Sequence, residues 1–276
     1  MNLSYCTLQY KNTPIPALEM LADMAGAQVA GPDGAPRRYD GVEWLITSVE
    51  KLTSTERRVL GQATRSAGLT TPVLGSYIGH YNLAMTNREE VLATAERSFR
   101  IAQELGTPRV RCFVGFVCEC SSIDCPPAYW AYNVAGFREV AAALDRFNRE
   151  QSADLRLCLE THSQSLVDTV AGCRRFLDEV GSDRIDLNLQ LEPPMLRDGI
   201  GSFLDAARAL RSRVCHVHTN PETIASDAAS LAAYRWLIED GYREYFSVEG
   251  HPPWPAGKTG AELARERLAA YTAVGL

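Results

Sequence analysis

The chain has 276 residues, of which 46% are hydrophobic and 22% charged, and its formal net charge is −6 at pH 7. This size and composition predict one globular domain over residues 1–276, and the acidic balance argues against nucleic acid or an anionic membrane surface as a partner. The N-terminal residues show no basic segment followed by a long apolar run, and no stretch approaches the roughly 20 apolar residues that span a bilayer, so we expect a cytoplasmic protein.

Strand-like and helix-like patterns alternate along the chain, which predicts a parallel α/β architecture. The predicted strands are 2–10, 40–46, 72–78 and 109–116, followed by four that end near residues 160, 190, 218 and 249. The predicted helices are 15–27, 54–67, 87–105, 130–150, 165–180, 201–211, 227–240 and 258–273. Eight strand–helix units in a chain of this length predict a single (β/α)8 TIM barrel.

Each of the last four predicted strands ends in a side chain that can bind a metal ion. These are Glu160 in LETH, Gln190 in LNLQLEP, His218 in HVHTNPE and Glu249 in SVEGHP, separated by 30, 28 and 31 residues. Each interval is close to one strand plus one helix plus two loops. A parallel barrel therefore predicts that the four side chains meet at the rim formed by the carboxyl ends of the strands.

The alternation of side chains along these strands supports the same prediction. Alternate residues of a strand point to opposite faces, so Leu157 and Leu159 share one face while Cys158 and Glu160 share the other. The polar faces of the three later strands carry Asp186, Asn188, Gln190 and Glu192, then His216, His218 and Asn220, then Ser247, Glu249 and His251. Burying such groups without partners costs several kcal/mol each, which predicts a bound cation or a hydrogen-bond network at the rim.

The eight cysteines do not suggest a disulfide framework, because several lie at strand positions where cysteine behaves as a small hydrophobic residue. Cys118, Cys120 and Cys125 form an unusual C-x-C-x4-C pattern without an obvious fourth ligand. Structural zinc sites usually have four ligands in paired short spacings, so we expect thiols in a loop near the rim rather than a zinc clip.

Several motifs resemble the xylose isomerase-like barrel superfamily of sugar and sugar-phosphate isomerases and epimerases. They are YDGVEW at 39–44, AQELGTPRVR at 102–111, and LETH, HVHT and SVEG at the later strands. The resemblance covers nearly the whole chain and implies one divalent cation, Mn, Co, Mg or Zn, held by Glu160, Gln190, His218 and Glu249. It also implies that Glu160 and Glu249 are the catalytic pair, one abstracting a proton beside a carbonyl and the other returning it through an enediolate.

The chain departs from this family at the sixth strand, where the family usually has Asp followed three positions later by His. Here Gln190 and Pro193 occupy those positions. An amide oxygen can coordinate a hard cation, so Gln190 is the favoured ligand, and Glu192 is the alternative source of a carboxylate. The absent histidine removes a substrate-binding group that is common in ketose epimerases.

Further polar residues are candidates for substrate contacts or for support of the ligands. His216 and Glu192 are expected behind the ligands, where metal-binding side chains are oriented by hydrogen bonds. The candidate substrate contacts are His80, His162, His251, Glu43 and Trp254. For Glu43 a structural ion pair is an equal alternative, and for Trp254 the alternative is that the ring holds its loop in place.

The leading interpretation is a metal-dependent isomerase or epimerase of a small carbohydrate, with homo-oligomerisation left open. A lyase or dehydratase acting on a keto-sugar, an inosose or a keto-glycoside uses the same groups and is the first alternative. A non-catalytic barrel that binds a sugar or a protein is the alternative of a different class. Apurinic endonuclease barrels have three-metal sites rich in histidine, and RCFVGF at the fourth strand provides none.

Overall fold

The computed structural model describes residues 1–79, 87–115, 120–222 and 224–276. Within these residues, eight strands form a closed barrel in the order β1-β10-β9-β8-β7-β6-β5-β4. Their bounds are β1 Asn2–Cys6, β4 Gly41–Leu45, β5 Leu74–Gly75, β6 Arg109–Cys112, β7 Arg156–Glu160, β8 Ile185–Gln190, β9 Val214–Thr219 and β10 Tyr245–Val248. The predicted (β/α)8 fold class is confirmed.

The helices follow the strands as the alternating pattern predicts. They are α1 Ala17–Ala25, α2 Ile46–Val49, α3 Ser54–Ser66, α4 Arg88–Leu105, α5 Pro127–Gln151, α6 Val170–Val180, α7 Pro193–Leu196, α8 Ile200–Arg208, α9 Ala228–Glu239 and α10 Gly260–Ala273. Capping residues fix several of these starts. Thr53 and Thr259 each form a capping box, with Glu56 and Glu262 respectively.

Several predicted bounds differ from the structure; for example, the strand predicted at 109–116 is a strand only at Arg109–Cys112, and the helix predicted at 165–180 begins at Val170. The first strand ends at Cys6 and continues as the 3-10 helix Thr7–Tyr10, because the Thr7 hydroxyl accepts a hydrogen bond from the Leu45 backbone at 2.8 Å. The strand predicted at 72–78 is ordered as a strand only at Leu74–Gly75. The sequence did not predict the antiparallel hairpin of β2 Gln28–Ala30 and β3 Pro36–Arg38, whose side chains are largely exposed and carry no hydrophobic period.

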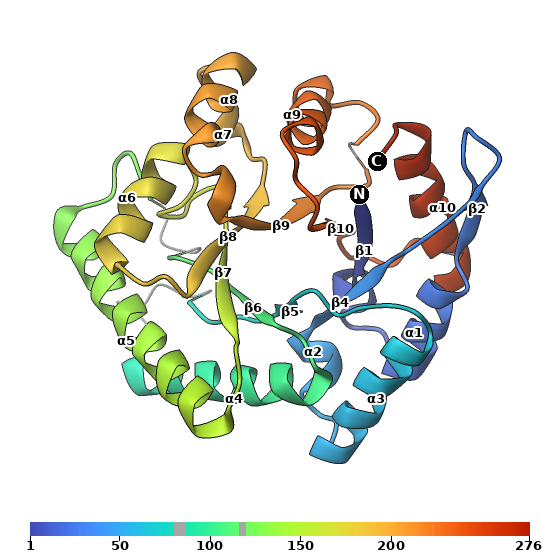
Figure 1. Ribbon diagram of the computed structural model, residues 1–276, viewed down its shortest axis with the longest axis horizontal. Coiled ribbons are helices and arrows are strands. Elements are labelled where there is room, and N and C mark those ends of the chain that lie inside the picture. Colours follow the sequence, from blue (N-terminus) through green and yellow to red (C-terminus); the bar gives the residue numbers. More distant parts are fainter. Residues whose placement is uncertain (80–86, 116–119, 223) are drawn as a thin grey trace. The chain divides into compact units, whose positions relative to one another are not determined.

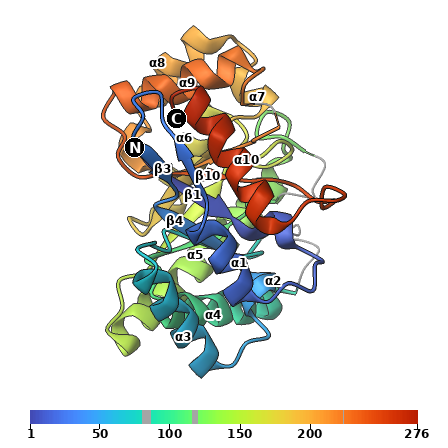
Figure 2. The ribbon, with the colours of Figure 1, turned by 90° about the vertical axis from the view of Figure 1, so that its right-hand side faces the viewer.

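The chain folds into two compact units. The single domain predicted from the sequence stays a prediction. The first unit comprises residues 1–74, 104–107 and 217–276. In it β1 pairs in parallel with β4 and with β10, and α1 packs beside α10 (Figure 2). The β2–β3 hairpin lies against α10. An N-terminal hairpin and the C-terminal helix therefore pack together in this unit.

The second unit comprises residues 75–103 and 108–216. Its strands β6, β7 and β8 pair in parallel, and α5 and α6 lie side by side (Figure 1). Edge-to-face contacts of Phe176 with Trp130 at 5.9 Å and with Phe137 at 5.4 Å join the two helices. Aromatic pairs in this geometry stabilise a core beyond the area that they bury.

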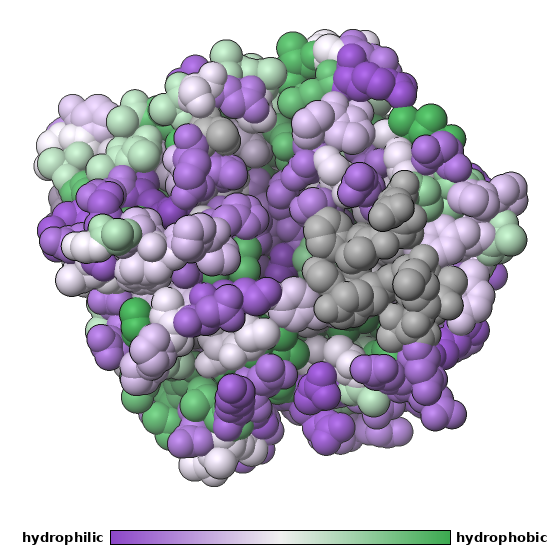
Figure 3. Space-filling model, turned by 180° about the vertical axis from the view of Figure 1, so that it is seen from behind, coloured by the Kyte–Doolittle hydropathy of each residue, from purple (hydrophilic) through white to green (hydrophobic). Residues whose placement is uncertain are grey.

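The surface is predominantly polar on the face shown in Figure 3, where hydrophobic residues are scattered among hydrophilic ones. The large hydrophobic side chains among the described residues that remain exposed are Met1, Leu18, Val59, Ile123 and Tyr132. None of the described helices combines the length and the apolar character needed to cross a membrane.

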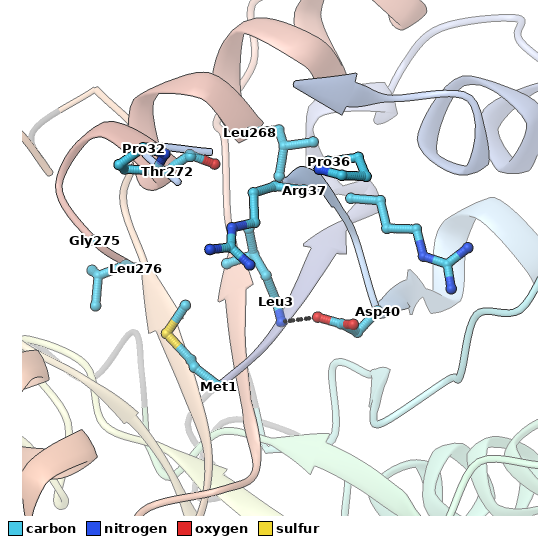
Figure 4. A pocket seen from close by; sticks show the side chains of 11 residues that line it. Met1, Leu3, Pro32, Pro36, Arg37, Asp40, Leu268, Thr272, Gly275 and Leu276 are labelled. Carbon is cyan, nitrogen blue, oxygen red and sulfur yellow. Dashed lines mark hydrogen bonds between the residues drawn. The ribbon is translucent and has the colours of Figure 1, made fainter. Parts of the chain in front are cut away.

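A half-open cavity of about 460 Å³ lies in the first unit (Figure 4). The β2–β3 hairpin, the end of α10 and the start of β1 line it, and Asp40 accepts a hydrogen bond from the Leu3 backbone at 2.9 Å at its edge. Leu3 and Asp40 lie at the amino-terminal ends of β1 and β4. Barrel enzymes work at the opposite ends of their strands, so this cavity is separate from the candidate functional site.

Candidate functional site

In the first unit, the imidazole of His218 lies between two carboxylates. Its Nε2 is 2.9 Å from Oε2 of Glu43, and its Nδ1 is 3.3 Å from Oε2 of Glu249. All three side chains are buried, with exposed fractions of 0% for Glu43, 1% for His218 and 3% for Glu249. An imidazole that faces two carboxylates with little access to water is a chemically unusual arrangement, typical of metal-binding and catalytic sites.

The strand register explains how Glu43 and Glu249 reach the same imidazole. Cys6 of β1 pairs with Glu43 of β4, and Tyr5 pairs with Val248 of β10, directly before Glu249. Glu43 and Glu249 therefore lie at nearly the same level on either side of β1. Because the Glu249 backbone donates a hydrogen bond to the carbonyl of Thr219, Glu249 is also level with the end of β9, which carries His218.

In the second unit, Glu160 at the end of β7 forms a buried ion pair with Arg111 of β6. The two side chains are exposed by only 2% and 3%. The register pairs Arg111 with Cys158 on the same face of the sheet, and the guanidinium also lies over the ring of Phe113 at 4.8 Å. The sequence predicted a cation or a hydrogen-bond network for the buried groups at the rim but gave no sign that Arg111 pairs with Glu160.

Gln190 and Glu192 contact each other at the end of β8. The Gln190 amide nitrogen donates to Oε1 of Glu192 at 2.8 Å, and the Ser163 hydroxyl donates to Oε2 of Glu192 at 2.6 Å. A carboxylate only accepts hydrogen bonds, so Glu192 fixes which way the Gln190 amide points. The Gln190 Oε1 atom is buried and has no hydrogen-bond partner among the described residues.

Asn188 lies one step deeper on the same face of β8. The register pairs Asn188 with Glu160, and its side chain is fully buried. Neither polar atom of the Asn188 amide has a hydrogen-bond partner in the described part of the chain. Buried polar atoms are normally satisfied, so this face of β8 favours a polar occupant such as water, an ion or a substrate hydroxyl. His216 of β9 is also fully buried.

The candidate substrate contacts occupy different surroundings. His162 is partly buried, and its Nδ1 lies 3.0 Å from the carbonyl of Ser163. His251 is half-exposed, with its Nε2 at 3.9 Å from Oε2 of Glu249. The Trp254 indole donates to the Lys258 carbonyl at 2.9 Å and its ring lies against Tyr10, an arrangement that holds the loop after β10 in place. His80 lies outside the described residues.

A second buried network, which the sequence analysis did not identify, supports the loop after β10. Nη2 of Arg267 donates to Oε1 of Gln9 and to Oε1 of Glu222, each at 2.7 Å. Gly250, next to Glu249, leaves the space for this guanidinium, since a Cβ atom there would lie 2.3 Å from Nη1 of Arg267. The backbone beside Glu249 is thereby packed against α10.

The described cysteines form no disulfide, and five of the seven are buried. Burial raises the pKa of the Cys112 and Cys158 thiols well above the ordinary value, so both stay protonated at neutral pH. Of the three loop cysteines, Cys118 lies outside the described residues. Protonated buried thiols are poor nucleophiles and metal ligands, so Cys112 and Cys158 are weak candidates for either role.

The donor atoms in both units suit a divalent cation. Glu43, Glu160, His216, His218 and Glu249 all belong to groups of carboxylate and imidazole side chains that could hold a metal ion. Carboxylate and amide oxygens and imidazole nitrogens are ligands for Mn, Co, Mg or Zn rather than for soft metals. The unpartnered Oε1 of Gln190 adds a neutral oxygen donor of the right kind.

Comparisons with known proteins are consistent with these observations. A model of the family described as xylose isomerase-like TIM barrel matches residues 38–271. No curated protein gave a significant match to the sequence.

Three solved structures resemble the chain over nearly its whole length. The probable 3-DHS dehydratase AsbF, involved in petrobactin synthesis in Bacillus anthracis, has a TM-score of 0.74 and 16% identity over 99% of both chains. The 3-keto-D-glucoside 4-epimerase YcjR from E. coli has a TM-score of 0.70 and 17% identity over 98% of both chains. A D-psicose 3-epimerase from Clostridium cellulolyticum H10 has a TM-score of 0.71 and 15% identity, over 99% of this chain and 98% of that one. At such identities these similarities establish a shared fold.

Proposed function

Because this chain belongs to the xylose isomerase-like TIM barrel family, we propose that it is a divalent-cation-dependent enzyme that isomerises or epimerises a sugar or sugar derivative. The observation that carries the proposal is His218, buried between the carboxylates of Glu43 and Glu249. It lies near the carboxyl end of a barrel strand, where enzymes of this fold place their active sites. Solved structures of the same fold named as epimerases of sugars and of a keto-glucoside support a small carbohydrate as the substrate.

The proposed cation ligands are Glu160, Gln190, His218 and Glu249. Their strands β7, β8, β9 and β10 are consecutive neighbours in the barrel order, which supports a common rim. Gln190 is preferred to Glu192 because both carboxylate oxygens of Glu192 already accept hydrogen bonds, from Gln190 and Ser163. The cation, when bound, would polarise the substrate carbonyl and stabilise negative charge on its oxygens.

The proton would move between the two glutamates. One carboxylate oxygen of Glu249 takes the proton from the carbon beside the carbonyl, and Glu160, which enters this turnover as the protonated acid, gives its proton to the neighbouring or the same carbon, or the two exchange roles. The two carboxyl groups then regain their starting protonation states by exchange with solvent after product release. Arg111 fixes the orientation of the Glu160 carboxylate through their ion pair. Burial of both glutamates strengthens their electrostatic interaction with the substrate.

The decisive experiment combines metal analysis with solvent deuterium exchange. Purified protein is assayed for bound Mn, Co, Mg or Zn, then incubated in D2O with a panel of ketoses, inososes and keto-glycosides. We expect stoichiometric cation and carbon-bound deuterium in at least one sugar, both lost in the Glu160→Ala/Glu249→Ala double variant. Protein that takes up none of the four cations and catalyses no exchange would instead be a sugar- or protein-binding barrel.

A lyase acting on a keto-sugar or a keto-glycoside is the second candidate, and the end of β8 favours it. Gln190 and Pro193 replace the Asp and His that the sequence resemblance led us to expect there, which removes one substrate-binding group of ketose epimerases. Elimination begins with the same proton abstraction but expels water or an alcohol. Mass spectrometry of the deuterated product distinguishes the two, because elimination lowers the substrate mass by the leaving group.

Replacing Gln190 by Asp tests the assignment of the ligand at β8. We expect the Gln190→Asp variant to bind Mn²⁺ as tightly as the wild type or more tightly, because it exchanges a neutral oxygen for a charged one. Isothermal titration calorimetry measures the Kd. Gln151→Asp at the end of α5 adds the same charge at an exposed position and should leave the Kd unchanged. Complete loss of cation binding in Gln190→Asp would contradict the assignment.

A further inference from the structure

Glu43 is a carboxylate in a position that strongly disfavours charge. It lies in the middle of β4, where all five residues are buried, and its own exposed fraction is 0%. Removing an ionised carboxylate from water costs several kcal/mol unless a partner compensates. His218 provides that partner, with Nε2 at 2.9 Å from Oε2 of Glu43.

The two nitrogens of the His218 ring are not equivalent. Nε2 lies 2.9 Å from Oε2 of Glu43 in hydrogen-bond geometry, and Nδ1 lies 3.3 Å from Oε2 of Glu249. An ionised carboxylate accepts and does not donate, so the shorter contact, the one with Glu43, favours the tautomer that carries its proton on Nε2. Metal-binding imidazoles generally donate their second N–H in this way, and the acceptor fixes both tautomer and ring orientation.

We propose that Glu43 is a positioning residue, which accepts the Nε2–H of His218 and so reserves Nδ1 as the atom that binds the cation beside Glu249. The inference rests on the proposed function, since the choice of donor atom has a consequence only when His218 is a ligand. It gives Glu43 a role through His218, in place of the direct substrate contact considered from the sequence.

Small side chains on β1 and β10 allow this contact. Ser4 pairs with Gly41 of β4 and with Ser247 of β10, and Cys6 pairs with Glu43. Residues that pair directly point to the same face, so small groups line that face between Glu43 and the strand that carries His218.

The backbone of His218 is held independently of its ring. The Tyr234 hydroxyl donates to the His218 carbonyl at 3.3 Å, and the Glu249 backbone donates to the next carbonyl, that of Thr219. The position of the strand therefore does not depend on Glu43. What Glu43 controls is the rotation of the ring and the nitrogen that carries its proton.

The test uses the full-length protein, the Glu43→Gln variant and two readouts. Glutamine has nearly the same shape but can donate as well as accept, so it no longer fixes the proton on Nε2. Isothermal titration calorimetry gives the Kd for Zn²⁺, and ¹⁵N–¹H NMR of histidine-labelled protein reports which ring nitrogen is protonated and which binds Zn²⁺. The sequence has five histidines, and a His218→Gln variant assigns the His218 signals. Glu239→Gln, an exposed change at the end of α9, is the control.

We expect wild-type His218 to show a protonated Nε2 and a Zn²⁺-bound Nδ1, and Glu43→Gln to weaken Zn²⁺ binding by about 10–100-fold and to lose the single tautomer. Unchanged Zn²⁺ affinity together with an unchanged ring in Glu43→Gln would overturn the inference and leave the proposed function intact. Failure of the wild type itself to bind Zn²⁺, Mn²⁺, Co²⁺ or Mg²⁺ would refute the proposed function. The NMR spectrum of the metal-free protein would then still decide whether Glu43 fixes the proton of His218.

Discussion

Glu249→Gln is expected to retain the fold and to lose turnover by roughly 10²–10⁴-fold in kcat, the usual contribution of a general acid or base. The substitution preserves the shape of the side chain and its capacity to hydrogen-bond toward His218 and His251, which Glu249 approaches. An amide cannot accept the proton that, in the proposed mechanism, the carboxylate takes from the substrate. The measurement is the rate of deuterium exchange into the sugar identified in the D2O screen.

Two controls separate loss of chemistry from loss of structure. Circular dichroism and urea unfolding should give nearly the same free energy of unfolding for Glu249→Gln and the wild type. Glu239→Gln makes the same chemical change at an exposed position and should keep full turnover. A Glu249→Gln protein with wild-type exchange rates would show that Glu249 does not transfer the proton.

In the metal-free protein, Arg111→Met is expected to lower the free energy of unfolding by about 3–5 kcal/mol, because it removes the guanidinium that is paired with the buried Glu160 carboxylate. Urea denaturation followed by fluorescence measures the change. The Arg111→Met/Glu160→Gln double variant removes both charges and should recover a substantial part of the loss.

The comparison with a surface pair makes this test specific. Arg208 pairs with Asp205 on α8 at 2.7 Å, with both side chains more than half exposed. Arg208→Met should change the free energy of unfolding by only about 0–1 kcal/mol, since water and salt screen exposed ion pairs. Similar small losses in Arg111→Met and Arg208→Met would mean that Glu160 is stabilised by something other than Arg111.

The alternation of side chains in the sequence correctly predicted which residues share a face. Cys158 and Glu160 were expected on one side of their strand, and the register pairs them with Asp186 and Asn188 of β8 on the same side. Phe246 of β10 alternates with Ser247 and should therefore point away from the polar face. Its ring packs against Tyr234 of α9, on the helix side of the strand. A period of two is a local property of the chain, so it can be read without knowing the fold.

The partners of the buried charges could not be read in that way. Arg111 lies 49 residues before Glu160, and alternation places Arg111 on a face without saying which carboxylate it meets. Glu43 and His218 are separated by 175 residues, so the sequence left Glu43 between a substrate contact and an ion pair. Long-range partners depend on strand order and register, which emerge only when the sheet is assembled.

Gly250 has a consequence for engineering this protein. Its missing side chain is what lets Arg267 sit against the polypeptide immediately after Glu249, and Gln9 Oε1 would lie only 2.4 Å from an added Cβ. Randomisation of the loops around the candidate site should therefore leave position 250 untouched. The mutable positions of that loop are the solvent-facing ones further along, such as Ala256 and Lys258, where new side chains meet water instead of a guanidinium.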